Sequence, residues 1–216
     1  VAAERGHQVT LFDADSEIGG QFNMAKQIPG KEEFHETIRY FQKRIEITGV
    51  QLELNSRQSA QSLIDQNFDE IILATGVSPR VTSIPGEGHP KVLNYIEVLR
   101  DHKAVGQKVA IVGAGGIGFD VAEYLTHEGE STSLNIQSYL KEWGIDPNNE
   151  VRGGIEGIQA QPHPPAREVF LMQRSDGKLG GKLGKTTGWI HRATLKNKKV
   201  KMLGSVEYLK IDDAGF

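Results

Sequence analysis

The stretch KVAIVGAGGIGFDVAEYL, residues 108–125, decides the fold. Its first part, Lys108–Val112, is short, apolar and β-branched, which predicts a strand. Gly113–Gly118 follows at once with the spacing G-x-G-x-x-G, and residues 119–125 continue as a helix. Strand, glycine-rich turn and helix in this order are typical of a dinucleotide-binding unit. The alternative is a glycine-rich turn that only packs against the sheet.

Each residue of this turn has an expected role. Gly113 permits the tight turn, Gly115 lets the backbone approach a pyrophosphate, and Gly118 allows close packing of the helix on the strand. Gly116 and Ile117 belong to the same turn, and the N–H groups and positive dipole end of the helix that follows would hold the phosphates. We therefore expect a dinucleotide at this turn.

The end of the next strand indicates which dinucleotide binds. Residues 168–174 read as a strand that ends in Arg174, after an insertion at about 128–167 that reads as a loop. An acid there would bond the 2′-hydroxyl of NAD, whereas an arginine offers a bidentate fork for the 2′-phosphate of NADP. Arg174 thus favours NADPH, unless it only caps a solvated strand end.

The loop after this strand is basic and carries Lys178, Lys182 and Lys185. We expect it to lie near the NADP phosphates. Residues 184–186 read Gly-Lys-Thr, as at the end of a P-loop, but position 179 is Leu where that motif needs Gly. A nucleotide hydrolase is therefore disfavoured. His191 could orient a nicotinamide or act as an acid, or it could be a structural residue.

Composition excludes several classes of function. The 216 residues are 38% hydrophobic and 25% charged, with a formal net charge of −3, which gives no case for nucleic-acid or membrane partners. The basic run at 196–201 reads as a solvated helix end or turn. The chain contains no cysteine, so it has no disulfide, thiolate nucleophile or cysteine-held iron–sulfur cluster, and we expect no metal. With no signal-peptide pattern, a cytoplasmic setting is the default.

The N-terminal part of the chain, residues 1–85, reads as a second nucleotide-binding unit. Residues 1–6 read as a helix end at Gly6, and residues 7–13 as a strand that ends in Asp13. Such an acid accepts hydrogen bonds from adenosine ribose hydroxyls, or it only opens a turn with Asp15. The pattern predicts a helix over 32–48 and a buried parallel strand over 68–76.

Both chain ends look cut, so we expect a piece of a larger protein. The fold class expected is α/β, with a Rossmann-like NADP-binding domain inserted in a partial FAD-binding domain that is truncated at both ends. Residues 77–91 read as a linker because prolines and glycines cluster there. Residues 1–85 would form the partial FAD domain, and residues 86–216 the NADPH domain.

Several stretches carry a closer resemblance to a known family. They are Ser16–Asn23, Ile28–Phe34, Gly116–Asp120, Gly129–Ser133 and Leu183–Arg192. These closely resemble bacterial NADPH-dependent 2,4-dienoyl-CoA reductases, which are old-yellow-enzyme-type NADPH oxidoreductases. The resemblance covers essentially the whole chain, including the insertion. It implies a relay from NADPH to FAD, through an iron–sulfur cluster to FMN, and then to a dienoyl-CoA thioester in unsaturated fatty acid β-oxidation.

The same resemblance implies site residues. It places FAD contacts at Asp13, Gln21, Lys31, the backbone near Gln58, and the turn after Gly76. The residues around Gln58 depart from the family's small β-branched residues. In the family the FMN barrel, the cluster and the substrate-binding residues lie N-terminal to this segment, so no catalytic residue is assigned here and the barrel is an expected partner. A noncatalytic NADP-binding sensor or interaction module is the alternative function.

Overall fold

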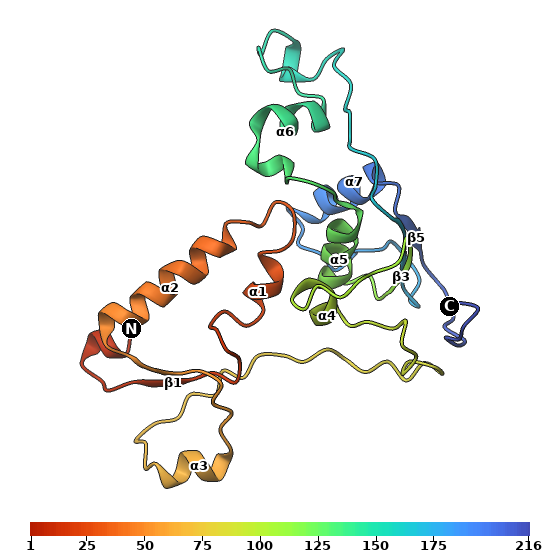
Figure 1. Ribbon diagram of the computed structural model, residues 1–216. Coiled ribbons are helices and arrows are strands. Elements are labelled where there is room, and N and C mark those ends of the chain that lie inside the picture. The colour runs from red at the N-terminus through yellow and green to blue at the C-terminus, as the bar shows by residue number, and fades with distance from the viewer. The chain divides into compact units, whose positions relative to one another are not determined.

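The computed structural model describes residues 1–216 and divides them into two compact units. Unit 1 contains residues 1–26 and 32–78, and unit 2 contains residues 27–31 and 79–216. Figure 1 shows the elements along the chain, in colours that run from red at the N-terminus to blue at the C-terminus. Each unit is described by itself.

Unit 1 is built on a pair of parallel strands. Its elements are η1 (Ala3–Arg5), β1 (Thr10–Phe12), α1 (Phe22–Ala25), α2 (Phe34–Thr48), β2 (Gln51–Glu53) and α3 (Ala60–Asp65). β1 pairs with β2, with Leu11 opposite Leu52. The expected helix end at Gly6 is confirmed, since Gly6 adopts a left-handed φ of 92° and donates its N–H to the Ala3 carbonyl.

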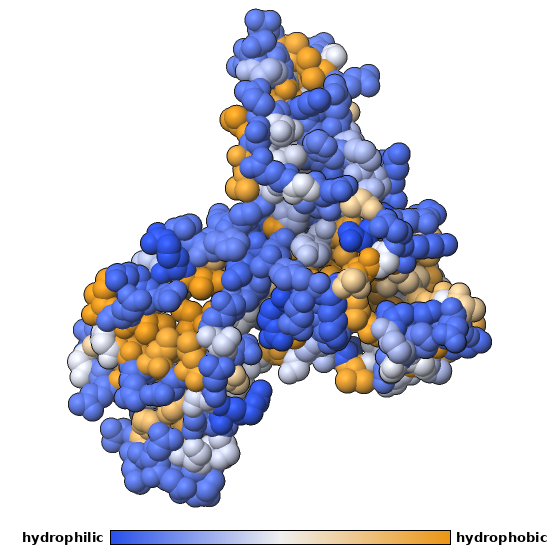
Figure 2. All heavy atoms as spheres, viewed as in Figure 1, coloured by the Kyte–Doolittle hydropathy of each residue, from blue (hydrophilic) through white to orange (hydrophobic).

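The long helix α2 confirms the helix expected over 32–48. It ends at Gly49, whose left-handed φ of 69° a residue with a Cβ adopts only at a cost. None of its residues is buried, and Tyr40, Phe41 and Ile47 are exposed. In Figure 2, apolar side chains gather over the α2 and β1 region of unit 1.

The prediction of a strand over residues 68–76 is wrong, because the structure has no strand there. Residues 71–80 adopt no regular structure, and Ile72 and Leu73 are 87% and 77% exposed. A buried parallel strand needs backbone partners beside it and cover on both faces. In the structure, β1 and β2 pair only with each other, so this apolar segment finds no ladder to join.

Unit 2 contains a three-stranded parallel sheet in the order β3-β4-β5. Its elements are α4 (Tyr95–Leu99), β3 (Lys108–Val112), α5 (Gly116–Thr126), η2 (Thr132–Leu134), α6 (Ile136–Trp143), η3 (Arg152–Gly154), β4 (Glu168–Met172), α7 (Gly188–Asn197) and β5 (Lys201–Leu203). α5 packs on β3 and β4 and lies beside α7. The strands and helices expected around the glycine-rich turn are confirmed.

The core of unit 2 lies between the sheet and these two helices. Val169 and Leu171 on the central strand β4 are buried, as are Phe119 on α5 and Leu195 on α7. β4 is paired on both sides, which explains its nearly continuous apolar sequence. Large-to-small substitution of such a residue costs about 2–5 kcal/mol.

The insertion at 128–167 is more ordered than the expected loop. It contains α6, which begins at the Asn135 cap, where the side-chain oxygen accepts the Ser138 N–H at 3.0 Å. The helix ends at Gly144, with a left-handed φ of 67°. The short α6 is easily missed in a sequence because it spans only eight residues, Ile136–Trp143.

The basic run at 196–201 was expected to be solvated, and Lys198 shows this to be wrong in part. Its side chain is only 6% exposed and forms an ion pair of 3.5 Å with Glu142 of α6.

No helix of the structure has the length and apolar character that a membrane span requires.

Candidate nucleotide-binding site

The glycine-rich turn joins the carboxyl end of β3 to the N-terminus of α5. Gly113 has a φ of 109°, a left-handed value that favours glycine, and donates its N–H to the Met172 carbonyl of β4 at 2.9 Å. Gly115 is extended and caps α5, where its carbonyl accepts the Phe119 N–H at 3.1 Å. The first N–H groups of α5 therefore have no partner within the helix and can face an anion.

A Cβ at each glycine of the turn would meet different surroundings. At Gly118 it would lie 1.9 Å from the Gly113 carbonyl oxygen and 3.4 Å from Leu171, so the helix and sheet could not keep their spacing. At Gly115 and Gly116 it would meet no atom within 4 Å. The structure thus separates a packing glycine from two that border open space, which a pyrophosphate could occupy. Ile117, which lies between Gly116 and Gly118 in the sequence, is exposed.

The loop after β4 carries the basic residues proposed for the nucleotide. Arg174 and Lys185 are exposed and form no hydrogen bond or ion pair through their side chains. The Gln173 amide donates to the carbonyls of Ser175 and Gly177, at 3.1 and 3.2 Å, and holds this loop. Arg174 is therefore free to bind an anion and lies on a loop that is already ordered by its neighbours.

The later part of this loop packs on α5. Gly180 is buried with a left-handed φ of 69°, and a Cβ there would lie 2.7 Å from the Phe119 ring. Its carbonyl accepts a hydrogen bond of 3.1 Å from Arg192 of α7. The segment was expected to be a basic loop, and these contacts show that its middle is packed against α5 and α7.

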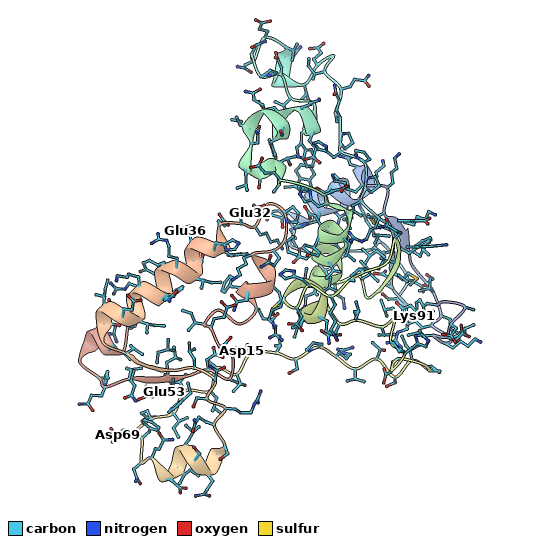
Figure 3. All side chains as sticks on the ribbon, viewed as in Figure 1. Asp15, Glu32, Glu36, Glu53, Asp69 and Lys91 are labelled. Atoms are coloured by element: carbon cyan, nitrogen blue, oxygen red, sulfur yellow. The ribbon has the colours of Figure 1, made fainter.

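Unit 1 holds four of the residues predicted to contact FAD. Asp13 follows β1 and opens a turn, in which one of its carboxylate oxygens accepts the Asp15 N–H at 3.0 Å. Figure 3 labels Asp15. The Gln21 amide donates to the Val77 carbonyl at 3.4 Å, directly after Gly76. The structure therefore brings the Gln21 loop and the Gly76 turn together.

Gln58 takes no part in that contact. It is half-buried and bonds Ser56 at 2.8 Å, and its side-chain oxygen accepts the Ser62 hydroxyl at the start of α3. These local bonds occupy its side chain. The predicted contact concerns its backbone and stays a prediction.

Lys31 belongs to unit 2 rather than to the unit of the other predicted FAD residues. Its ammonium lies 2.6 Å from the Asp120 carboxylate on α5, and both side chains are about one-quarter exposed. One turn further along α5, Glu123 lies 3.6 Å from the ring of His191 on α7. The Glu123 carboxylate raises the pKa of His191 above its ordinary value, against the opposing effect of burial.

Asp120 and Glu123 did not emerge from the sequence as site residues. They stand three positions apart and therefore share one face of α5. Two acids at this spacing just after the glycine-rich turn are the signal that could have identified them. Together with Lys31 and His191 they form a group of two acids and two bases.

Buried Asn23 was also missed. It is 4% exposed, donates to the Ile18 carbonyl at 3.2 Å and accepts from Lys26 at 3.0 Å, which organises the loop that carries Gln21. A Cβ at Gly19 would lie 2.9 Å from the Asn23 amide, which explains the glycine there. A lone asparagine in a loop gives no sequence signal for this role.

The comparison with known families is decisive here. Residues 1–215 match the family described as pyridine nucleotide-disulphide oxidoreductase. The chain belongs to this family. The expected α/β fold class with parallel sheets is thereby confirmed, and FAD and NAD(P) are the cofactors that this oxidoreductase domain implies. Although the name of the pyridine nucleotide-disulphide oxidoreductases mentions a disulphide, this chain contains no cysteine.

Individual relatives extend the comparison. A metal reductase of Desulforamulus reducens is 26% identical over 219 residues, all of this chain and 31% of the relative. A cinnamate reductase of Clostridium sporogenes is 34% identical over 67% of this chain and 22% of the relative. A solved structure of 2-naphthoyl-CoA reductase with 2-naphthoyl-CoA superposes with a TM-score of 0.74 at 24% identity, over 99% of this chain and 27% of that one. The chain thus spans less than a third of the length of these proteins.

The residues present fit a nicotinamide nucleotide at the turn. Gly115 and Gly116 border open space, and the N-terminus of the eleven-residue α5 offers N–H donors. Unit 1 offers a partial fit to FAD, through Asp13 at the end of β1 and the Gln21 and Gly76 loops that meet.

Proposed function

We propose that this chain is the NADPH-binding portion, with part of the FAD-binding portion, of a flavoprotein reductase that acts on 2,4-dienoyl-CoA. When bound, NADPH supplies a hydride and FAD accepts it. FMN and an iron–sulfur cluster would lie elsewhere in the full-length protein and carry electrons to the dienoyl thioester, because these 216 residues contain no cysteine to ligate a cluster.

The proposal rests on two features together, the glycine turn after β3 and Arg174 on the loop after β4. The turn presents helix N–H groups to a pyrophosphate. Arg174, on the loop after the adjacent strand β4, has a guanidinium without an acid partner. Such a free guanidinium can bind the 2′-phosphate in a bidentate manner, which NADH cannot exploit. Lys185 on the same loop adds positive charge.

The substrate class rests on the resemblance of this sequence to dienoyl-CoA reductases. Relatives named as reductases, including the cinnamate reductase, support a reductive direction. In this role Asp13 would accept ribose hydroxyls of FAD, while Gln21, Lys31, the Gln58 backbone and the Gly76 turn would position it.

Titrations of NADPH and NADH test the nucleotide site. Arg174→Ala should weaken NADPH binding at least about tenfold and leave NADH binding nearly unchanged, because only NADPH carries the 2′-phosphate. Lys43→Ala, on the exposed surface of α2, is the control for a lost positive charge. Equal losses for both nucleotides would overturn the proposed role of Arg174.

A second pair of variants tests the turn. Gly115→Ala places a methyl group in open space, so it should lower stability by no more than about 1 kcal/mol, the cost of alanine at an N-cap, but weaken the binding of both nucleotides by blocking the pyrophosphate. Gly106→Ala, also in open space but before β3, should change neither. Full NADPH affinity in Gly115→Ala would contradict binding at this turn. Assay of the full-length protein for NADPH-dependent reduction of a 2,4-dienoyl-CoA tests the activity.

A further inference from the structure

A basic groove lies along one side of α7, outside the glycine turn. It has a volume of about 520 Å³ and is lined by Lys178, Trp189, Arg192, Lys196, Lys199 and Met202, among others. Trp189, Arg192 and Lys196 stand three and seven positions apart, so they share one face of the helix. We call this feature the Trp189 groove. Its volume is in the range of small-molecule sites.

The positive charge of the Trp189 groove has no compensation from the protein. Lys178, Lys196 and Lys199 form no side-chain ion pair or hydrogen bond, and no acid lines the groove. Arg192 uses one nitrogen on the Gly180 carbonyl, and its other N–H groups stay available.

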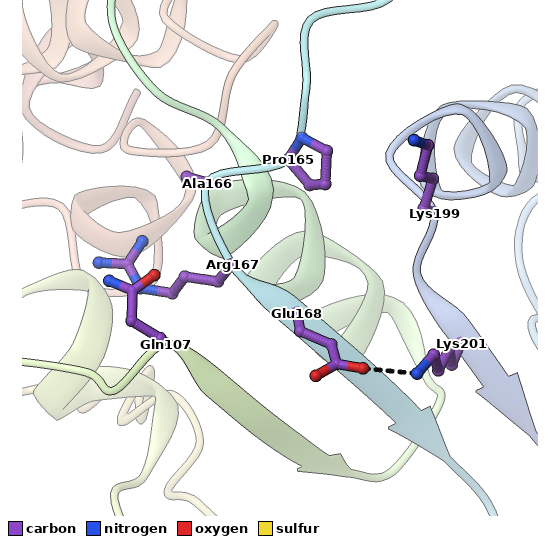
Figure 4. Close-up of a pocket in the computed structure, with 7 residues that line it drawn as sticks. All are labelled: Gln107, Pro165, Ala166, Arg167, Glu168, Lys199 and Lys201. Carbon is purple, nitrogen blue, oxygen red and sulfur yellow. Dashed lines mark hydrogen bonds and ion pairs between the residues drawn. The ribbon is translucent and has the colours of Figure 1, made fainter.

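The neighbouring cavity gives a contrast. Its lining includes Lys199 and also Lys201, which forms an ion pair of 2.5 Å with Glu168 (Figure 4). In that close-up Lys199 lies at the end of α7 with no acid joined to it. Uncompensated cations repel one another, so an anion that binds among them relieves that repulsion.

The floor of the Trp189 groove is apolar and aromatic. Trp189 is 59% exposed, which is unusual for so large an apolar ring, and Met202 of β5 lies beside it in the lining. An exposed indole is a stacking platform for a nucleic base, and cations around it suit the phosphates of the same ligand.

The groove and the turn lie at different strands of the sheet. The turn follows β3, the groove borders β5, and β4 lies between them. No residue of the turn lines the groove. Strand spacing of about 4.8 Å puts the two strands roughly 10 Å apart, so the groove is a separate place for a ligand group.

We propose that the Trp189 groove binds a phosphorylated adenosine, with the base stacked on Trp189 and the phosphates on Lys178, Arg192, Lys196 and Lys199. A CoA thioester can supply this group through its 3′-phosphoadenosine, and this source rests on the function proposed above. The 2′-phosphoadenosine of NADPH is not this ligand, because its 2′-phosphate is assigned to Arg174, which does not line the groove.

Tryptophan fluorescence of the full 216-residue chain tests the proposal. The chain has two tryptophans, so Trp143→Phe leaves Trp189 as the sole reporter. We expect saturable quenching by 3′,5′-ADP, weakened at least fivefold in Lys196→Ala/Lys199→Ala. Lys43→Ala/Lys141→Ala removes the same charge elsewhere and should bind as the parent does. Absence of saturable quenching, or an equal loss in this control, would overturn the proposal.

Two further arms test the source. We expect 3′,5′-ADP to bind better than 2′,5′-ADP, and Gly115→Ala to leave the affinity for 3′,5′-ADP unchanged. Tighter binding of 2′,5′-ADP, or a loss of 3′,5′-ADP affinity in Gly115→Ala, would overturn CoA as the source. Nicotinamide fluorescence reports NADPH at the turn independently, so loss of that signal tests the proposed function without deciding the groove. Calorimetry with Trp189→Leu should show weaker nucleotide binding, and unchanged affinity would contradict the stacking role.

Discussion

Lys31 and Asp120 are joined by an ion pair of 2.6 Å between Nζ and Oδ1, although they stand 89 positions apart in the chain. The pair ties the short segment 27–31, in which Ile28 is also buried, to α5. The ion pair therefore fixes a residue predicted to bind FAD on the helix that begins at the glycine turn.

A double-mutant cycle measures this ion pair. With Lys31→Met and Asp120→Asn, we expect a coupling of about 1 kcal/mol in the free energy of unfolding, because both groups are only partly exposed. The exposed pair Lys43–Glu46 on α2 should give about 0.5 kcal/mol or less. Urea denaturation gives both values, and a coupling near zero for Lys31 and Asp120 would refute the anchoring role.

The pair of His191 and Glu123 predicts a pH dependence. Because Glu123 raises the pKa of His191 in the folded chain, the charged ring stabilises the fold fully below the unfolded pKa of about 6.5. This contribution is lost as pH rises through the higher folded pKa. The free energy of unfolding of the wild type should exceed that of Glu123→Gln by at most about 1 kcal/mol at low pH. This difference in stability should vanish at high pH.

Unfolding free energies measured from pH 5.5 to 8.5 check this prediction. NMR titration of the His191 ring in Glu123→Gln should show its pKa move down. Glu207→Gln, which removes an exposed acid, should show no such pH-dependent difference. A constant difference at every pH would show that Glu123 acts through packing alone.

The ion pair between Glu142 and Lys198 should stabilise the insertion at 128–167. Lys198 is 6% and Glu142 13% exposed, Glu142 also accepts the Thr132 hydroxyl at 2.6 Å, and Lys198 donates to the His163 carbonyl at 3.3 Å. Glu142→Gln would leave a buried ammonium without its acid, at a cost of about 3 kcal/mol.

The double variant Glu142→Leu/Lys198→Met removes both charges and should cost less than Glu142→Gln alone. Urea denaturation gives the two stabilities. Trypsin should also cleave the insertion faster in Glu142→Gln, at Lys141 or Arg152. Wild-type stability and cleavage in Glu142→Gln would show that the ion pair does not hold α6 to α7.

Local sequence predicted the elements whose signals lie within a few residues of one another. The strand, turn and helix of residues 108–125 follow from β-branched residues, three spaced glycines and an apolar helix face, which need no distant partner. Gly6 and Gly49 mark helix ends for the same reason, since left-handed backbone favours glycine.

Segments that depend on a distant partner were predicted less well. Residues 68–76 have strand composition but no neighbouring strand to pair with. Lys198 lies in a basic run that is typical of a solvated surface. In the structure it is buried and forms an ion pair with Glu142, which lies 56 positions away in the sequence. In both cases the deciding partner lies outside the window that a local pattern can report.

The sequence by itself determined the βα nucleotide-binding unit, the family resemblance and the absence of an internal thiol, because each is written in short motifs or in composition. Only the tertiary structure decided which charges meet: the Lys31–Asp120 pair, His191 beside Glu123, and the cations left unpaired around Trp189. The physical reason is that electrostatic pairing depends on distances in space, and folding brings together residues that the chain holds far apart.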